Sequence, residues 1–306
     1  MRVGRKTWAL IALGFVLVLA MVVAAQRYRY RFVHTNSDLI GLLPRTDGTL
    51  FFADISKLRT AGYLRYLAGS SPAQEKDYAE FLRETGFDWR NDIDALAGTI
   101  DARELLAVVR GRVHAGKIRQ YEKAHGGDCA SDVCSLPAST PGRWLSFVEV
   151  QPDVIALAVS ADKTAAHQLQ REGPSQTRVL SDAPVWLKPS PALLSNPAQL
   201  PVALRIFAIA LQSADSAVVS LRSANDSGAA FEIEMNAWFP NQSAADSARA
   251  QLELNTKMLK LEFIREHKQA APGDLASLLI SGSFRSNAKE LIASWPVQPE
   301  LLQALE

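Results

Sequence analysis

The sequence predicts an α+β protein in which an N-terminal transmembrane helix precedes two subdomains of the ferredoxin-like type. Three observations lead to this prediction. Residues 7–25 form an uncharged apolar run, strands and helices alternate irregularly with adjacent hairpins, and six prolines fall within residues 172–201. Adjacent hairpins favour an α+β fold over a doubly wound parallel sheet. Proline-rich segments seldom hold regular elements, so residues 172–201 are expected to connect the subdomains.

Residues 7–25 approach the length of about 20 apolar residues that a membrane-spanning helix needs. Three basic residues precede this run, which favours a cytoplasmic N-terminus, although three arginines also follow it. Residues 1–30 are therefore expected to comprise a cytoplasmic tip and the transmembrane anchor. The alternative is a cleavable signal peptide, because Val23 and Ala25 provide small residues before Gln26. We expect a single-pass inner-membrane protein bound to the membrane through residues 7–25, with most of the chain extracytoplasmic, or a secreted protein after cleavage.

The first subdomain, residues 38–171, is expected to follow a split β-α-β-β-α-β order. Its strands are rich in β-branched and aromatic residues, and its helices show helical spacing of apolar positions. The expected strands are 49–55, 95–100, 104–110, 144–150 and 154–160, and the expected helices are 58–67, 72–85, 114–124 and 162–171.

The second subdomain, residues 202–306, matches a similar unit only in part. Residues 229–239 alternate apolar and polar side chains, which predicts a strand with one buried face. Residues 225–228 supply turn-forming types for a hairpin. The expected order is helix 202–212, strands 217–223 and 229–239, helix 243–267, strand 278–284 and helix 288–295.

The composition is that of an ordinary globular protein, with 48% hydrophobic and 21% charged residues. The formal net charge is only +1. A nucleic-acid-binding protein would normally carry a clear basic excess, so no nucleic-acid partner is expected.

The two cysteines, Cys129 and Cys134, are predicted to form a disulfide, because such bonds persist outside the cytoplasm. The closed loop is short, so its effect on stability would be local. Free thiols and a metal site that adds His125, with Asp128 or Asp132, are the alternatives. Zinc usually takes four ligands, and one cysteine pair is a weak indication of such a site. No metal or cofactor is predicted.

Several motifs imitate catalytic or nucleotide-binding sites. Residues 111–118, GRVHAGKI, have the glycine and lysine spacing of a P-loop, but Ile118 stands where Ser or Thr must ligate magnesium. Asp92 with Asp94, and Asp101 with Glu104, could each be paired carboxylates, although acidic residues at loop ends are usually solvated caps. No catalytic residue is therefore predicted.

Four stretches resemble uncharacterised single-anchor proteins of soil bacteria: LLPRTDGTLFFADISKLR, TGFDWRNDIDALAG, HGGDCASDVCSLPASTPGRWLSF and DVIALAVSADKTAA. The resemblance covers most of residues 40–170. It implies a position on the outer side of the inner membrane and an α+β fold. It implies no activity and supplies no catalytic residues.

The sequence thus predicts a membrane-anchored extracytoplasmic protein with a non-catalytic binding role, whose partner is an envelope protein, an envelope polymer or a small ligand. The alternative is an envelope hydrolase or transferase without a recognisable motif. A deep polar pocket joining His125, Asp128 and the acidic residues near Asp92 would favour the enzyme. An exposed apolar patch would favour the binding protein, because such patches mark interaction sites.

Overall fold

The computed structural model describes residues 35–64, 76–169, 180–223, 231–265, 274–298 and 301. The apolar run at residues 7–25, expected to be the membrane anchor, lies outside the described residues. Within the described ranges, no helix combines the length and the hydrophobicity needed to cross a membrane.

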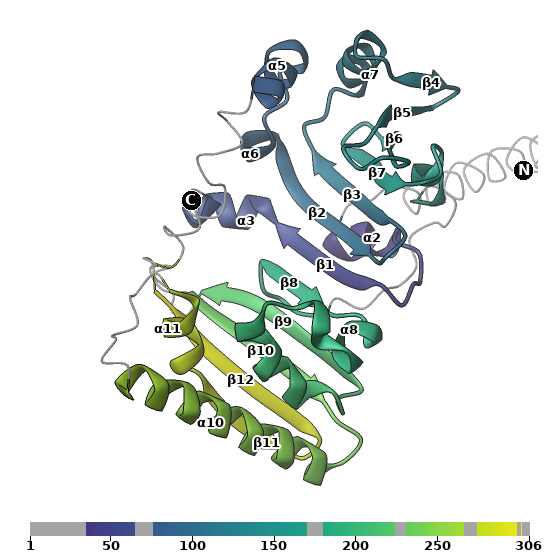
Figure 1. The fold of residues 1–306 in the computed structure, drawn as a ribbon. Coiled ribbons are helices and arrows are strands. Elements are labelled where there is room, and N and C mark those ends of the chain that lie inside the picture. Colours follow the sequence, from purple (N-terminus) through teal and green to yellow (C-terminus); the bar gives the residue numbers. More distant parts are fainter. Residues whose placement is uncertain are drawn as a thin grey trace, which may run out of the picture.

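One twelve-stranded antiparallel sheet organises the described chain (Figure 1). The strand order is β11-β12-β10-β9-β8-β1-β2-β3-β7-β6-β5-β4. The strands are β1 (Thr49–Asp54), β2 (Ile93–Ile100), β3 (Leu105–Gly111), β4 (Asp128–Ala130), β5 (Val133–Pro137), β6 (Trp144–Gln151), β7 (Val154–Ser160), β8 (Val185–Lys188), β9 (Ser216–Ser223), β10 (Phe231–Trp238), β11 (Ser283–Asn287) and β12 (Glu290–Val297).

The prediction of two ferredoxin-like subdomains is wrong, because this sheet runs through both halves of the chain. The link is β8, which pairs with β1 on one side and with β9 on the other. This strand forms inside the proline-rich stretch because Pro184 and Pro189 flank it and leave its four residues free to pair. The α+β class holds, no transmembrane helix is shown, and the division at residues 172–201 stays a prediction.

Helices pack against the sheet near both of its ends (Figure 1). The long helix α10 lies against β11 and β12, whereas α5 and α7 pack on each other beside the strands of the opposite end. The helices are α2 (Asn36–Gly41), α3 (Ile55–Thr60), α5 (Lys76–Thr85), α6 (Trp89–Asp92), α7 (Ala115–Ala124), α8 (Pro191–Ser195), α9 (Val202–Ala208), α10 (Gln242–Arg265) and α11 (Leu275–Ile280), with 3-10 turns η2 (Ala165–Leu169), η3 (Pro197–Gln199) and η4 (Ile209–Leu211).

The buried apolar side chains form three clusters. One lies under α10 and α11, and a second lies beneath α2 and η2 around the stacked rings of Phe52 and Trp186. The third is small and includes Ile118 of α7, Cys134 of β5 and Phe147 of β6. This third cluster carries the candidate site.

Several predicted elements differ from the structure. The expected strand 278–284 and helix 288–295 are wrong, because α11 is followed by the hairpin β11–β12. Buried and partly exposed side chains alternate along β12, which is the period of a strand, and Ala288 makes the turn with φ of 51°. The expected helix 58–67 covers only the end of α3, and the expected helix 162–171 is reduced to η2. The turn expected at residues 225–228 lies outside the described residues.

Candidate functional site

An apolar cavity of about 230 Å³ lies between α5, α7 and the neighbouring strands. Aromatic and aliphatic side chains make up nearly all of its wall. Glu122 of α7 contributes the only carboxyl group among the described lining residues. The lining residues are Phe81, Phe87, Ile93, Val109, Ile118, Tyr121, Glu122, Leu136, Leu145, Phe147, Ile155 and Leu157.

Helical periodicity explains how α7 builds one wall. Ile118, Tyr121 and Glu122 are three and four positions apart, so they share the helix face that meets the sheet. The helix ends where the amide of Gly127 donates to the carbonyl of Glu122 over 2.8 Å, and Gly126 adopts the left-handed conformation with φ of 83°.

Aromatic contacts between α5 and α7 hold the other wall. The ring of Phe81 meets the Tyr121 ring edge-on, with centroids 5.1 Å apart. A second edge contact joins Phe81 to Phe87 at 6.1 Å. Such edge-to-face pairs add about 0.5–1.5 kcal/mol beyond the burial of their area. They fix the position of α5 over the cavity.

Glu122 is the unusual residue of this site. Only 3% of its surface is exposed, and its Oε2 atom has no hydrogen-bond partner among the described residues. Burial raises the pKa of the Glu122 carboxyl from its usual 4.5 to about 7. Buried polar atoms are normally paired, so an unpaired carboxyl oxygen beside a cavity points to a missing partner.

The predicted disulfide between Cys129 and Cys134 is confirmed. The two cysteines face each other across the hairpin of β4 and β5, in a stretch that the sequence indicated only as a loop. Both sulfur atoms are used in this bond, so the alternative metal site on the cysteines and His125 is wrong. A carboxylate oxygen of Glu122 and the two sulfur atoms lie within 4.8 Å of one another.

His125 lies with the acidic residues of α5 instead. Its ring and the carboxylates of Glu80 and Glu84 have potential ligand atoms within 4.8 Å of one another. The His125 Nδ1 atom is hydrogen-bonded to the Tyr121 carbonyl at 2.8 Å, which leaves Nε2 for a ligand. However, the Arg83 guanidinium already pairs with both glutamates, at 3.3 and 3.5 Å. A cation would therefore have to displace an existing positive charge.

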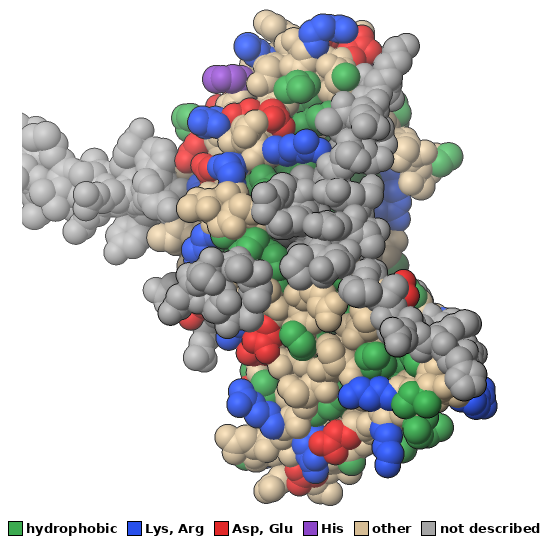
Figure 2. Space-filling model, turned by 90° about the vertical axis from the view of Figure 1, so that its left-hand side faces the viewer, with side chains coloured by type: hydrophobic (Ala, Val, Ile, Leu, Met, Phe, Trp, Pro, Cys, Tyr) green, Lys and Arg blue, Asp and Glu red, His purple; other side chains and the backbone are tan. Residues whose placement is uncertain are grey.

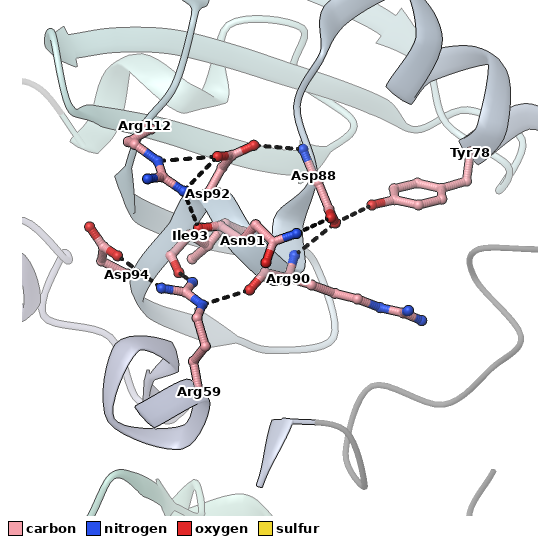
Figure 3. A network of polar contacts seen from close by, with 9 residues as sticks. All are labelled: Arg59, Tyr78, Asp88, Arg90, Asn91, Asp92, Ile93, Asp94 and Arg112. Carbon is pink, nitrogen blue, oxygen red and sulfur yellow. Dashed lines mark hydrogen bonds and ion pairs between the residues drawn. The ribbon is translucent and has the colours of Figure 1, made fainter. Parts of the chain in front are cut away.

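The carboxylates near Asp92 belong to a structural network around α6 (Figure 3). Asp92 accepts from the Asp88 amide at 2.8 Å and pairs with Arg112 at 3.1 Å. Asp94 instead pairs with Arg59 at 3.5 Å. The two carboxylates thus have separate arginine partners, and the network orients the segment that carries the cavity residues Phe87 and Ile93.

Tyr78 extends this network from α5. Its hydroxyl donates to the Asp88 carboxylate over 3.1 Å (Figure 3). The pKa of the Tyr78 hydroxyl is raised, first by partial burial and then by the nearby negative charge of Asp88. This bond links α5 to α6 at the rim of the cavity.

The remaining motif-like stretches, Asp101 with Glu104 and residues 111–118, also have structural roles. Asp101 does not form a pair with the Glu104 side chain, because its Oδ1 accepts from the amides of Arg103 and Glu104. These two backbone bonds lower the pKa of the Asp101 carboxyl. In the P-loop-like stretch, the Gly111 amide donates to the Asp153 carbonyl, so it is not free to bind phosphate.

No family model matches this sequence, and no curated protein matches it. Solved structures do resemble the fold. The structure of crystal form III of TP0453 aligns with a TM-score of 0.50 and 10% identity, and the alignment covers 88% of this chain and 97% of that one. Crystal forms IV and I of TP0453 align with TM-scores of 0.48 and 0.46, at 8% and 11% identity. At this identity the likeness shows the fold alone.

Glu122 is not among the residues predicted from the sequence. The signal was present, because the spacing of Ile118 and Tyr121 places Glu122 on the apolar face of the helix at 114–124. An acidic residue on such a face is either paired or part of a site. The sheet that closes the cavity could not be derived from that helix alone.

A second surface feature is a row of exposed apolar side chains on the C-terminal half of α10. Leu254, Met258, Leu261 and Ile264 are between 49% and 69% exposed. They lie on the opposite side of the helix from Leu252, which packs into the core. On the face shown in Figure 2, positive and negative side chains are interspersed among apolar ones in the described surface.

Proposed function

We propose that this protein has a non-catalytic binding role outside the cytoplasm and takes a small apolar ligand into the cavity beneath α5 and α7. The observation that supports this proposal is the Oε2 atom of Glu122, which has no hydrogen-bond partner among the described residues and lies in an otherwise apolar wall. Ligand sites typically combine apolar walls with a few polar groups that fix the orientation of the ligand. Glu122 has the position of such an orienting group.

The cavity limits the size of the ligand. A cavity of 150 Å³ accommodates benzene, so 230 Å³ corresponds by proportion to a group of about nine non-hydrogen atoms. The ligand should carry one hydrogen-bond donor, because an unpaired buried acceptor costs about 1–3 kcal/mol. A flat apolar ring with one N–H or O–H group meets both conditions.

The proposed location rests on two features. The Cys129–Cys134 disulfide is typical of oxidising compartments outside the cytoplasm. In addition, the apolar run at residues 7–25 supports attachment to the membrane or passage across it.

Titration with indole and with indene, observed by NMR chemical shifts, tests this proposal. The two molecules have the same size, but only indole carries an N–H donor. We expect both to shift the signals of Phe147 and Ile155, with indole binding about tenfold more tightly, because only indole can pair with Glu122. In a Glu122→Met variant the preference for indole should disappear. Absence of binding by either molecule would refute the proposed function.

Docking of a partner protein on α10 is a second candidate role, favoured by its row of exposed apolar side chains. Such a partner would cover Met258 near the middle of the row. Hydrogen exchange and cross-linking in the presence of native envelope extract would show protection centred on Met258. Unchanged exposure of α10 under these conditions would exclude this role.

A further inference from the structure

We propose that the Cys129–Cys134 disulfide undergoes thiol–disulfide exchange with a dithiol partner, and that Glu122 supplies a proton to the sulfur that leaves inside the protein. This activity shares Glu122 with the proposed ligand site, but it does not require that the cavity hold a ligand. It rests on the position of the disulfide in the sheet, on the different burial of its two cysteines, and on the distance of both sulfur atoms from Glu122.

The disulfide lies where an external thiol can approach. It joins β4 to β5, and β4 is the last strand in the order of the sheet. Asp128 and Ala130, on either side of Cys129, are both exposed. Cys129 itself is half-buried, whereas Cys134 is only 1% exposed. An incoming thiolate therefore reaches Cys129 more readily than Cys134.

Attack on Cys129 releases Cys134 in an apolar environment. Cys134 packs in the third core cluster with Phe147 and Ile118. A thiolate is unfavourable in such surroundings, so it needs a proton as it leaves. Glu122 can supply this proton, because it has a carboxylate oxygen within 4.8 Å of both sulfur atoms. Burial raises the pKa of the Glu122 carboxyl to about 7, so this carboxyl is mostly protonated below pH 7.

The exchange takes place in two displacement steps that conserve atoms and electrons. The first thiolate of the partner dithiol attacks the Cys129 sulfur, the Cys129–Cys134 bond breaks, and the Cys134 thiolate takes the Glu122 proton. The partner's second thiol loses its proton to water and attacks the partner sulfur of the mixed disulfide. Cys129 then leaves as a thiolate and is protonated by water, which also restores the Glu122 proton. Two electrons pass from the partner dithiol, which becomes a disulfide, to the two cysteines.

Other charged groups surround α7, but no ion pair joins any of them to Glu122 within the described structure. Their positions matter because each could change the pH dependence of the exchange. Burial alone is the cause of the raised pKa of Glu122. The titratable and charged residues on the elements around Glu122 include Glu80, Arg83 and Glu84 of α5, His114, Lys117, Arg119, Tyr121, Lys123 and His125 in or next to α7, Asp128 of β4 and Glu149 of β6.

The test is the rate at which dithiothreitol reduces this disulfide in the folded protein between pH 5.5 and pH 8.5. Acid quenching, alkylation and mass measurement report the reduced fraction, and each rate constant is divided by the fraction of dithiothreitol present as thiolate. We expect the corrected constant of the native protein to be about tenfold higher at pH 6 than at pH 8.5, because a general acid acts only while protonated.

Two variants separate proton donation from local charge. Glu122→Gln should give a corrected rate constant that is independent of pH and about tenfold below the native value at pH 6. Asp128→Asn removes an exposed carboxylate next to Cys129 and should retain the native pH profile. Identical flat profiles for all three proteins would overturn the proposal. A rate that does not depend on the dithiothreitol concentration would also overturn it, since opening of the fold would then limit the reduction. Either result would leave indole binding unaffected, which distinguishes it from failure of the proposed function.

Discussion

Replacement of Glu122 by Gln should change how the stability of the protein depends on pH. The folded protein raises the pKa of this carboxyl from 4.5 to about 7, so it holds the proton more tightly than the unfolded chain does. The stabilising contribution is complete below pH 4.5 and is lost as the pH rises through 7. A shift of this size corresponds to about 3 kcal/mol at 1.36 kcal/mol per pKa unit. The amide of Gln does not ionise, so the variant should lack this loss.

Urea unfolding of both proteins at pH 5 and at pH 8.5, without reductant, measures this effect. At each pH, the free energy of unfolding of the native protein is subtracted from that of the variant. This subtraction cancels the contribution from the titration of every other carboxyl group. We expect the variant to gain about 2–3 kcal/mol relative to the native protein between these two pH values. An equal difference at pH 5 and pH 8.5 would refute the conclusion that the Glu122 carboxyl is buried without a partner from the described part of the chain.

Four further substitutions, one of them a control, test the fold. Gly98→Ala should cost about 1–3 kcal/mol in urea unfolding, because a Cβ atom there would overlap the Phe51 ring across the β1–β2 pair; an unchanged midpoint would contradict this register. Leu252→Ala should lower the free energy of unfolding by about 2–5 kcal/mol, because the Leu252 side chain is only 1% exposed. Leu254 is 52% exposed, so Leu254→Ala should change this free energy by no more than about 0.5 kcal/mol. Equal losses in the two variants would mean that α10 is rotated. Arg59→Ala should cost about 1–3 kcal/mol through loss of the bonds from its guanidinium to two backbone carbonyls; calorimetry with no shift in melting temperature would exclude that role.

Local elements of this protein follow from its sequence, but the arrangement of its sheet does not. The strands predicted at 95–100, 104–110, 144–150 and 154–160 are confirmed as β2, β3, β6 and β7, because apolar, β-branched runs next to tight turns specify them locally. Pairing of β8 with β1 and β9 joins residues far apart in the chain. No local pattern encodes this pairing, so one continuous sheet could not be distinguished from two smaller sheets.

The candidate site shows the same division between local and distant information. Spacing and compartment were enough to predict the disulfide of Cys129 and Cys134. The approach of Glu122 to both sulfurs depends on how α7 packs on the β4–β5 hairpin, which looked like an irregular loop. Asp92 and Asp94 show the opposite case, since adjacent carboxylates in the sequence acquired separate arginine partners in the structure.

The most direct test of the central claim is calorimetric titration of indole into the native protein and into a Leu157→Phe variant. Leu157 lines the cavity, so a larger ring at this position should fill it and reduce the affinity for indole at least about tenfold. Leu259→Phe is the matched control, because Leu259 packs against the cluster under α10 and not against the cavity. We predict native affinity in the control and loss of affinity in Leu157→Phe. Equal affinity in all three proteins would place indole elsewhere and contradict the assignment of this cavity as the binding site.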